Sequence, residues 1–124
     1  DRLTLFLLHF SFFLKNYKNE KNKKILQEIY DFNFRQLELS IREIGYGDQS
    51  INKKMKDYIN LFHLIINKID DWNLINDTEK KKRIKSLLNL NDIDNLSVYF
   101  DKYSVELKNN TLNYYIKSVI KPKN

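Results

Sequence analysis

The sequence predicts an all-α protein, and three of its features support this prediction. The 124-residue chain contains two glycines and one proline, too few for the turns that many short strands require. Its apolar fraction of 42% is ample for the core of one domain. Apolar residues also recur every three or four positions over most of the chain, as in helices buried along one face. We expect a single compact helical domain over residues 1–124, with about five to six helices.

The first expected helix, residues 3–14, is almost entirely apolar (LTLFLLHFSFFL). Such a segment is too short to span a bilayer, which requires about 20 residues. The polar run at residues 15–24 offers no small-residue cleavage site of the kind that follows a signal peptide. We therefore expect a buried helix; a helix that rests on a membrane surface is the alternative.

Two long central helices are expected next, over residues 20–44 and 50–71. The first has a wide apolar stripe, which predicts neighbours on more than one side; the stripe comprises Ile25, Leu26, Ile29, Tyr30, Phe32, Phe34, Leu37, Ile41 and Ile44. The second has a cleaner apolar face, formed by Ile51, Met55, Tyr58, Ile59, Phe62, Ile65, Ile66 and Ile69. Its lysines fall largely elsewhere on the helix.

The remainder of the chain predicts three shorter helices. A loop over residues 72–77 leads to a helix over 79–90, which Asp77 or Thr78 can cap. Asn91 and Asp92 offer a cap for a helix over 93–107, which ends at the pair Asn109 and Asn110. A last helix is expected over 111–120, followed by a flexible tail at 121–124.

The charge of the chain leaves two interpretations open. The net charge is +6, and lysine supplies nearly all of the excess. Abundant lysine, asparagine and isoleucine can reflect an AT-rich genome, or the lysines can form a surface attracted to nucleic acid, ribosome or anionic lipid. The absence of cysteine excludes disulfides and thiolate metal sites.

The sequence contains no pattern that argues for catalysis. His9 lies in the apolar first segment, where we expect it to be partly buried and hydrogen-bonded, and His63 is an ordinary helix histidine. Neither has a metal-ligand partner at helical spacing, and no serine sits in a nucleophile elbow. The Asp70–Asp71 pair is more simply explained as a helix-end feature. We predict a protein that is not an enzyme and uses no cofactor or metal.

Both glycines lie in one stretch, REIGYGDQSINKKMK, at residues 42–56. A phosphate loop would need G-x-x-x-x-G-K-[ST] after a strand or a third glycine, whereas this stretch follows a helix. We expect a corner that needs both glycines, with Gly45 left-handed after the helix end and Asp48 or Ser50 capping the next helix. The lysines that follow this corner lie close together beside the N-terminus of the next expected helix. The predicted partner-binding residues are Arg42, Glu43, Gly45, Gly47, Asp48, Lys53 and Lys56.

Three stretches of the sequence carry a family resemblance. Residues 37–56 read L-x-x-x-I-R-E-I-G-Y-G-D-x-S-I-x-K-x-M-K, residues 1–14 read D-R-L-x-x-x-x-L-H-x-x-x-x-L, and residues 29–38 read IYDFNFRQLE. Together they resemble the ubiquinol–cytochrome c chaperone family, the assembly factors of respiratory complex III. Tyr46 departs from the family pattern, in which a small apolar residue is usual. The resemblance covers residues 1–69 and is weaker beyond Trp72.

The resemblance implies a non-catalytic helical chaperone that binds newly made cytochrome b. It also implies a small partner protein, association with the ribosome near the tunnel exit, and work at the inner membrane, either in a bacterium of the alphaproteobacterial type or in mitochondria. Family members have a further stretch before the position of Asp1, so we expect an N-terminally trimmed chain. An apolar groove between helices would shield the client, and basic surface would hold the protein near ribosome or anionic lipid.

The alternative hypothesis is a basic helical module that binds nucleic acid or the ribosome. It rests on charge alone, and it predicts lysines along one continuous face and binding that weakens steeply with salt. Scarce arginine and the lack of a recognition-helix pattern argue against it.

Overall fold

The computed structural model describes residues 2–88 and 93–119, and within them it contains helices and no strand. The helices are α1 (Arg2–Tyr17), α2 (Lys23–Ile44), α3 (Asp48–Ile69), a short 3-10 helix η1 (Trp72–Leu74), α4 (Asp77–Leu87), α5 (Ile93–Asn109) and α6 (Leu112–Val119). The all-α prediction is therefore confirmed. The expected cap at Asn91 and Asp92 and the expected tail at 121–124 lie outside the described residues.

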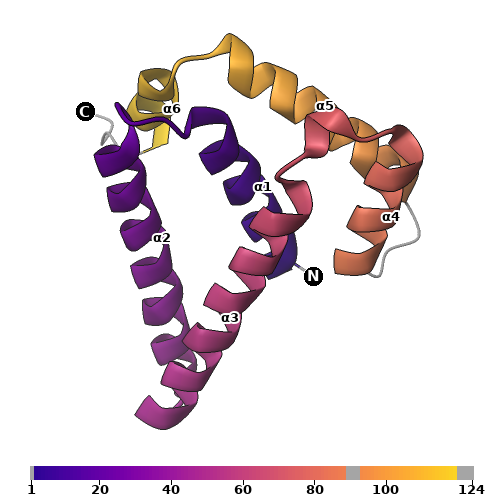
Figure 1. Ribbon diagram of the computed structural model, residues 1–124. Coiled ribbons are helices and arrows are strands. Elements are labelled where there is room, and N and C mark those ends of the chain that lie inside the picture. Colours follow the sequence, from indigo (N-terminus) through magenta and orange to yellow (C-terminus); the bar gives the residue numbers. More distant parts are fainter. Residues whose placement is uncertain (1, 89–92, 120–124) are drawn as a thin grey trace.

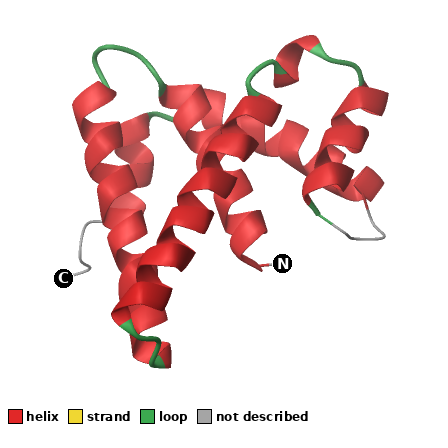
Figure 2. Ribbon diagram, turned by 60° about the horizontal axis from the view of Figure 1, so that its bottom comes forward, coloured by secondary structure: helices red, strands yellow, loops and turns green. Residues whose placement is uncertain are grey.

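Helix α1 lies in the middle of the helical domain (Figure 1). It packs most closely on α3 and then on α5, and α4 pairs with α5. Helices α2 and α3 form a hairpin whose corner projects away from α5 and α6 (Figures 1 and 2). None of the helices in the described part of the chain is long and apolar enough to cross a membrane.

The prediction of a buried first helix is confirmed. Leu7 and Leu8 have no exposed surface. The ring of Phe12 stacks on Phe100 of α5 with centroids 5.0 Å apart, and it meets Trp72 edge-on at 5.2 Å. Burial of such aromatic side chains dominates core energetics, so α1 is the helix around which the others gather.

The C-terminal end of α1 is tied to the C-terminal end of α5. The Tyr17 hydroxyl lies 2.7 Å from the carbonyl oxygen of Leu107 and 2.8 Å from that of Asn110, and donates to this pair. Burial raises the pKa of Tyr17 to about 12, so its proton stays in place at physiological pH. Because Tyr17 is buried and bonded, α1 continues three residues beyond the predicted end at Leu14.

An aromatic cluster joins α1, α2 and α3. Phe62 of α3 is fully buried, and its ring centroid lies 5.3 Å from Phe10, 5.5 Å from Phe34 and 5.8 Å from Tyr30. The wide stripe of α2 is nevertheless covered less than its pattern predicted, because Phe32 stays 51% exposed and Ile44, at the helix end, 72% exposed.

A first polar network holds the α3–α4 connection. Asn76, not the predicted Asp77 or Thr78, caps α4, and its side chain accepts a bond from the Glu79 N–H at 2.8 Å. Arg83 of α4 pairs with Asp71 and donates to the Lys68 carbonyl at 3.0 Å. The side chain of Asn76, one residue before Asp77, is therefore better placed to reach the free N–H groups of the first turn of α4.

A second network fixes α4 on α5 beside the buried indole of Trp72. The Trp72 Nε1–H and the Lys80 ammonium both donate to Asp101 Oδ1 at 2.9 Å. The same ammonium lies 5.4 Å from the centre of the Trp72 ring, within range of a cation–π interaction. One carboxylate therefore serves η1, α4 and α5 together.

Replacing Asp71 by Asn should reveal a pH-dependent stabilisation. The bond from Arg83 holds the pKa of Asp71 below its ordinary value of 3.8. A carboxyl whose pKa is lowered by folding stabilises the fold fully above the unfolded-state value and loses this effect as pH falls through the folded value. Urea unfolding should show Asp71→Asn less stable than the native chain at pH 7, with the difference shrinking below about pH 4. A difference that is constant with pH would contradict this assignment.

Candidate functional site

The predicted partner-binding residues gather at the α2–α3 corner, and all seven are exposed. The structure brings Arg42 and Asp48 together, with Arg42 Nη1 2.9 Å from Asp48 Oδ1. Arg42 also lies 3.7 Å from Glu38 one turn earlier. Among the described residues, Glu43, Lys53 and Lys56 form no ion pair. Such exposed pairs contribute little to stability, so the corner is held mainly by its backbone.

The two glycines of the corner have different backbone conformations and different roles. Gly45 has φ +102°, the left-handed conformation expected after a helix end, and its N–H bonds to the Arg42 carbonyl at 3.0 Å. Gly47 has φ −73° and ψ 163°, which other residues adopt freely. The expectation that the corner needs both glycines is therefore wrong for Gly47.

The expectation of a side-chain cap on α3 is also wrong. Gly47 occupies the capping position and provides no side chain, while Asp48 is the first helical residue. The Asp48 carboxylate turns back to Arg42 and still complements the positive helix terminus. Beside it, the Lys54 ammonium lies 4.6 Å from the centre of the Tyr46 ring. Tyr46 thus gives Lys54 an aromatic partner.

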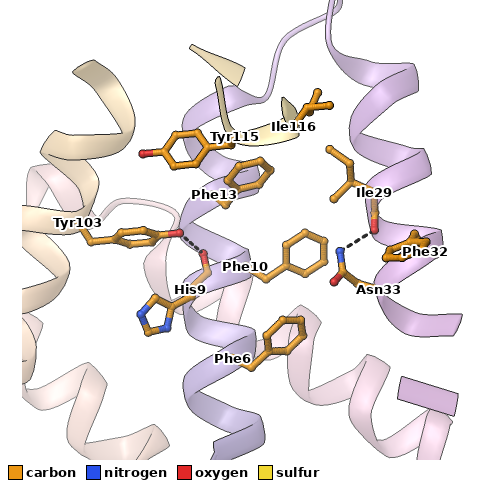
Figure 3. Close-up of a pocket in the computed structure, with 10 residues that line it drawn as sticks. All are labelled: Phe6, His9, Phe10, Phe13, Ile29, Phe32, Asn33, Tyr103, Tyr115 and Ile116. Carbon is orange, nitrogen blue, oxygen red and sulfur yellow. Dashed lines mark hydrogen bonds between the residues drawn. The ribbon is translucent and has the colours of Figure 1, made fainter. Parts of the chain in front are cut away.

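A second candidate site, which the sequence did not locate, is an apolar pocket on the opposite half of α2. Its cavity volume is about 240 Å³. Figure 3 shows its walls: Phe6, His9, Phe10 and Phe13 from α1, Ile29, Phe32 and Asn33 from α2, Tyr103 from α5, and Tyr115 and Ile116 from α6. Phe6 is 43% exposed and Phe32 51% exposed, so large apolar surface faces water at this pocket.

The few polar groups of the pocket are mostly engaged within the protein. His9 Nδ1 lies 2.7 Å from the Leu5 carbonyl oxygen and must donate to it; in the neutral ring Nε2 then accepts from the Tyr99 hydroxyl at 2.6 Å. This confirms a partly buried, hydrogen-bonded His9. The Tyr103 hydroxyl donates to the His9 carbonyl at 3.4 Å, and burial raises the pKa of Tyr103 well above its ordinary value.

The side chain of Asn33 adds a hydrogen-bond acceptor to the pocket wall. The Asn33 amide nitrogen donates to the Ile29 carbonyl at 2.8 Å (Figure 3), which leaves the Asn33 side-chain oxygen on the other arm of the amide. The site can therefore accept apolar side chains from a bound segment and one hydrogen bond from it. His63 takes no part in this pocket, because it lies exposed on α3.

Part of the pocket was visible in the sequence. Phe6, Phe10 and Phe13 are spaced four and three residues apart, so they form one stripe on α1. The whole first helix was expected to be buried, because periodicity cannot tell a covered stripe from an open one. The remaining walls come from α2, α5 and α6, and no local pattern predicts that α5 and α6, far away in the chain, meet the first two helices here.

The fold and these two surfaces define an all-α protein with an open apolar pocket and an exposed polar corner. The sequence matches the family model described as ubiquinol-cytochrome C chaperone over residues 1–79. The chain therefore belongs to the ubiquinol-cytochrome C chaperone family, and a chaperone family implies a non-catalytic role. The match contains α1, α2, α3, the glycine corner and the α1 and α2 walls of the pocket. Searches of curated proteins and of solved structures found no match.

The unequal roles of the two glycines can be tested by alanine substitution. Gly45→Ala should cost about 1–2 kcal/mol of unfolding free energy, because a Cβ is strained in the left-handed conformation. Gly47→Ala should change the unfolding free energy by no more than about 0.5 kcal/mol, since alanine readily adopts this backbone conformation. Alanine caps a helix slightly less well than glycine, but it also lowers the entropy of the unfolded chain, and the two effects offset each other. Open space surrounds both positions, so urea unfolding of the pair compares backbone conformation alone. Equal costs would contradict the assignment.

Proposed function

We propose that the protein is an assembly chaperone of respiratory complex III, which holds an apolar segment of newly made cytochrome b in the pocket between α1 and α2. The observation that carries this proposal is an apolar pocket with water-exposed phenylalanines, in a chain of the ubiquinol-cytochrome C chaperone family. The client, complex III and work at the respiratory membrane, bacterial or mitochondrial, are all part of the proposal.

The size of the pocket favours side chains of a polypeptide over a cofactor. Its volume of about 240 Å³ lies below the roughly 300–1,000 Å³ of typical small-molecule sites. One or two large apolar side chains of a client helix would fill it, as in the docking of a helix into a groove. Covering Phe6 and Phe32 removes apolar surface from water, which favours binding by roughly 25 cal/mol per Å².

The chemistry of the pocket also suits temporary holding. The protein satisfies the polar atoms of His9 and Tyr103 itself, so a client gains few directional bonds beyond the Asn33 oxygen. Apolar contact without many hydrogen bonds accepts varied segments and lets them go again. A chaperone needs this property, because the client must leave for its final place in the complex.

Changing the two exposed phenylalanines should weaken client binding without unfolding the protein. The double variant Phe6→Ser/Phe32→Ser should recover about tenfold less newly made cytochrome b in crosslinking from the native membrane fraction, because exposed aromatic anchors carry much of such binding. Leu74→Ser is the matched control, since Leu74 is 87% exposed and lies outside the pocket. Undiminished crosslinking by a folded double variant would refute the pocket as the client site.

We further propose that the α2–α3 corner contacts a partner protein of the assembly pathway or the ribosome. This surface combines exposed apolar Ile44 and Tyr46 with Lys53 and Lys56, a mixture that suits a partner with apolar and acidic groups. The corner lies at the far end of the hairpin from α6 (Figure 1), so a partner there would leave the pocket open.

Substitutions at the corner should separate partner binding from client binding. Asp48→Ala and Lys53→Glu should each lower recovery of partner or ribosomal proteins several-fold in pull-downs, through lost or reversed charge at the contact. Both should retain crosslinking at the pocket. Lys85→Glu on α4, an exposed lysine away from the corner, controls for charge. Intact partner binding together with normal cytochrome b accumulation in both variants would refute the corner as a contact.

The arrangement of the lysines does not favour the nucleic-acid alternative. Most of the described lysines lie at the α1–α2 turn, at the α2–α3 corner and on α4, which lie at different ends of the molecule (Figure 1). A module that tracks a phosphate backbone would carry them along one continuous face.

A further inference from the structure

A second hollow lies on the other face of the α1–α2 pair. It has a volume of about 790 Å³ and is lined by Ser11, Leu14, Lys15, Lys18, Asn19, Glu20, Lys23, Leu26, Gln27, Tyr30, Ile66, Ile69 and Asp70. It shares no residue with the apolar pocket proposed to hold the client, here named the client pocket. The client pocket is closed by α5 and α6, whereas this hollow is closed by α3. The two sites therefore lie on different faces of the same helix pair.

The rim of this hollow belongs to the most basic segment of the chain. Residues 15–24, here named the lysine turn, contain Lys15, Lys18, Lys21, Lys23, Lys24 and one acid, Glu20. Five lysines and one glutamate give a charge of +4, against +6 for the whole chain. Lys15 is half-buried and the other four lysines are exposed, and none of the five pairs with a carboxylate of the described residues.

The fold adds to this positive potential. Helix α2 begins within the lysine turn, at Lys23, and its first turn contains no acidic residue. Lysines at a helix N-terminus oppose the helix dipole and are locally unfavourable. An anion bound there would relieve the repulsion among the lysines and interact favourably with the helix terminus.

We propose that the lysine turn and the hollow beside it bind an anionic phospholipid at a membrane surface. The headgroup phosphate binds Lys18 and Lys23, and the lipid's apolar portion packs on the apolar floor of the hollow. Unpaired lysines next to an apolar surface suit anionic lipids. The floor is chiefly aliphatic, formed by Leu14, Leu26, Ile66 and Ile69.

The composition of the site favours lipid over the two other anionic partners. Single-stranded nucleic acid is held by aromatic platforms on which bases stack, and Tyr30, half-buried, is the only aromatic residue that lines this hollow among the described residues. Acidic protein segments are best matched by the forked guanidinium of arginine, and the lysine turn has no arginine. Lysine acts as a point charge and suits a phosphate.

Membrane contact at this hollow would leave the client pocket accessible. The two sites are separated by the side chains of Phe10 and Tyr30, whose ring centroids lie 6.5 Å apart. Phe10 lines the client pocket and Tyr30 lines the hollow. A protein docked through the lysine turn can thus take up a client from the other face. The lipid proposal does not rest on the client proposal, because vesicles report on it without any client.

The test is sedimentation of the full chain with vesicles of phosphatidylcholine alone or mixed with phosphatidylglycerol. We expect binding to the anionic vesicles only, and weakening with salt. Lys18→Glu/Lys23→Glu should lower the binding about tenfold or more, since each basic residue near an anionic surface contributes substantially. Lys82→Glu/Lys85→Glu is the matched control, because it makes the same charge change at two exposed lysines of α4 and should bind nearly as well. Circular dichroism checks that both variants fold.

Four outcomes would overturn the proposal. The native chain fails to bind anionic vesicles, or both double variants lose binding equally, which assigns the effect to net charge. Inorganic phosphate at the same phosphate concentration displaces the protein fully, which identifies a free-anion site. Poly(U) binds more tightly than the vesicles and depends on Lys18 and Lys23, which identifies an RNA site. Normal vesicle binding by Phe6→Ser/Phe32→Ser would keep the lipid result separate from the fate of the client proposal.

Discussion

The structure depends on the need to cover α1 on every side. Between Leu3 and Leu14 this helix has almost no polar face, so no orientation on the surface of a soluble assembly would satisfy it. Helix α3 covers one side and α5 another, through contacts such as Phe10 with Phe62 and Phe12 with Phe100. The remaining side, along Phe6 and Phe13, receives only parts of α2 and α6. The client pocket is the place where the covering of α1 is incomplete.

The same constraint sets the position of α2. Large rings fill the space between α1 and α2, with Tyr30 4.6 Å from Phe34 and 6.5 Å from Phe10 between ring centroids. These rings hold α2 farther from α1 than α3 lies, as Figure 1 shows. A helix pair separated by side chains leaves a hollow on each face. The pocket and the lysine-rimmed hollow therefore have one physical origin, the size of the aromatic residues between the two helices.

The sequence predicted the helices well, because each is specified by a local period and by breakers. The glycine corner was located correctly, and Gly45 adopts the left-handed conformation that its position after a helix predicts. The caps were predicted less well, since Asn76, Asp77 and Thr78 are all suitable residues and only the backbone geometry selects Asn76. The exposure of Phe32 could not be predicted either, because it depends on which distant helices stop short of α2. For the same reason an apolar groove between helices could be expected, but the residues that line it could not be named.

Helix α2 connects the three surfaces that the proposals use. Its first turn lies in the lysine turn, its middle forms one wall of the client pocket through Ile29, Phe32 and Asn33, and its last turn enters the corner at Arg42. Only four of its residues are buried, namely Leu26, Ile29, Phe34 and Ile41. Its other residues are at least partly exposed, so one helix presents its first turn, its middle and its last turn to three different surfaces. A membrane or a partner at one end of α2 would thus leave the pocket at its middle accessible to a client.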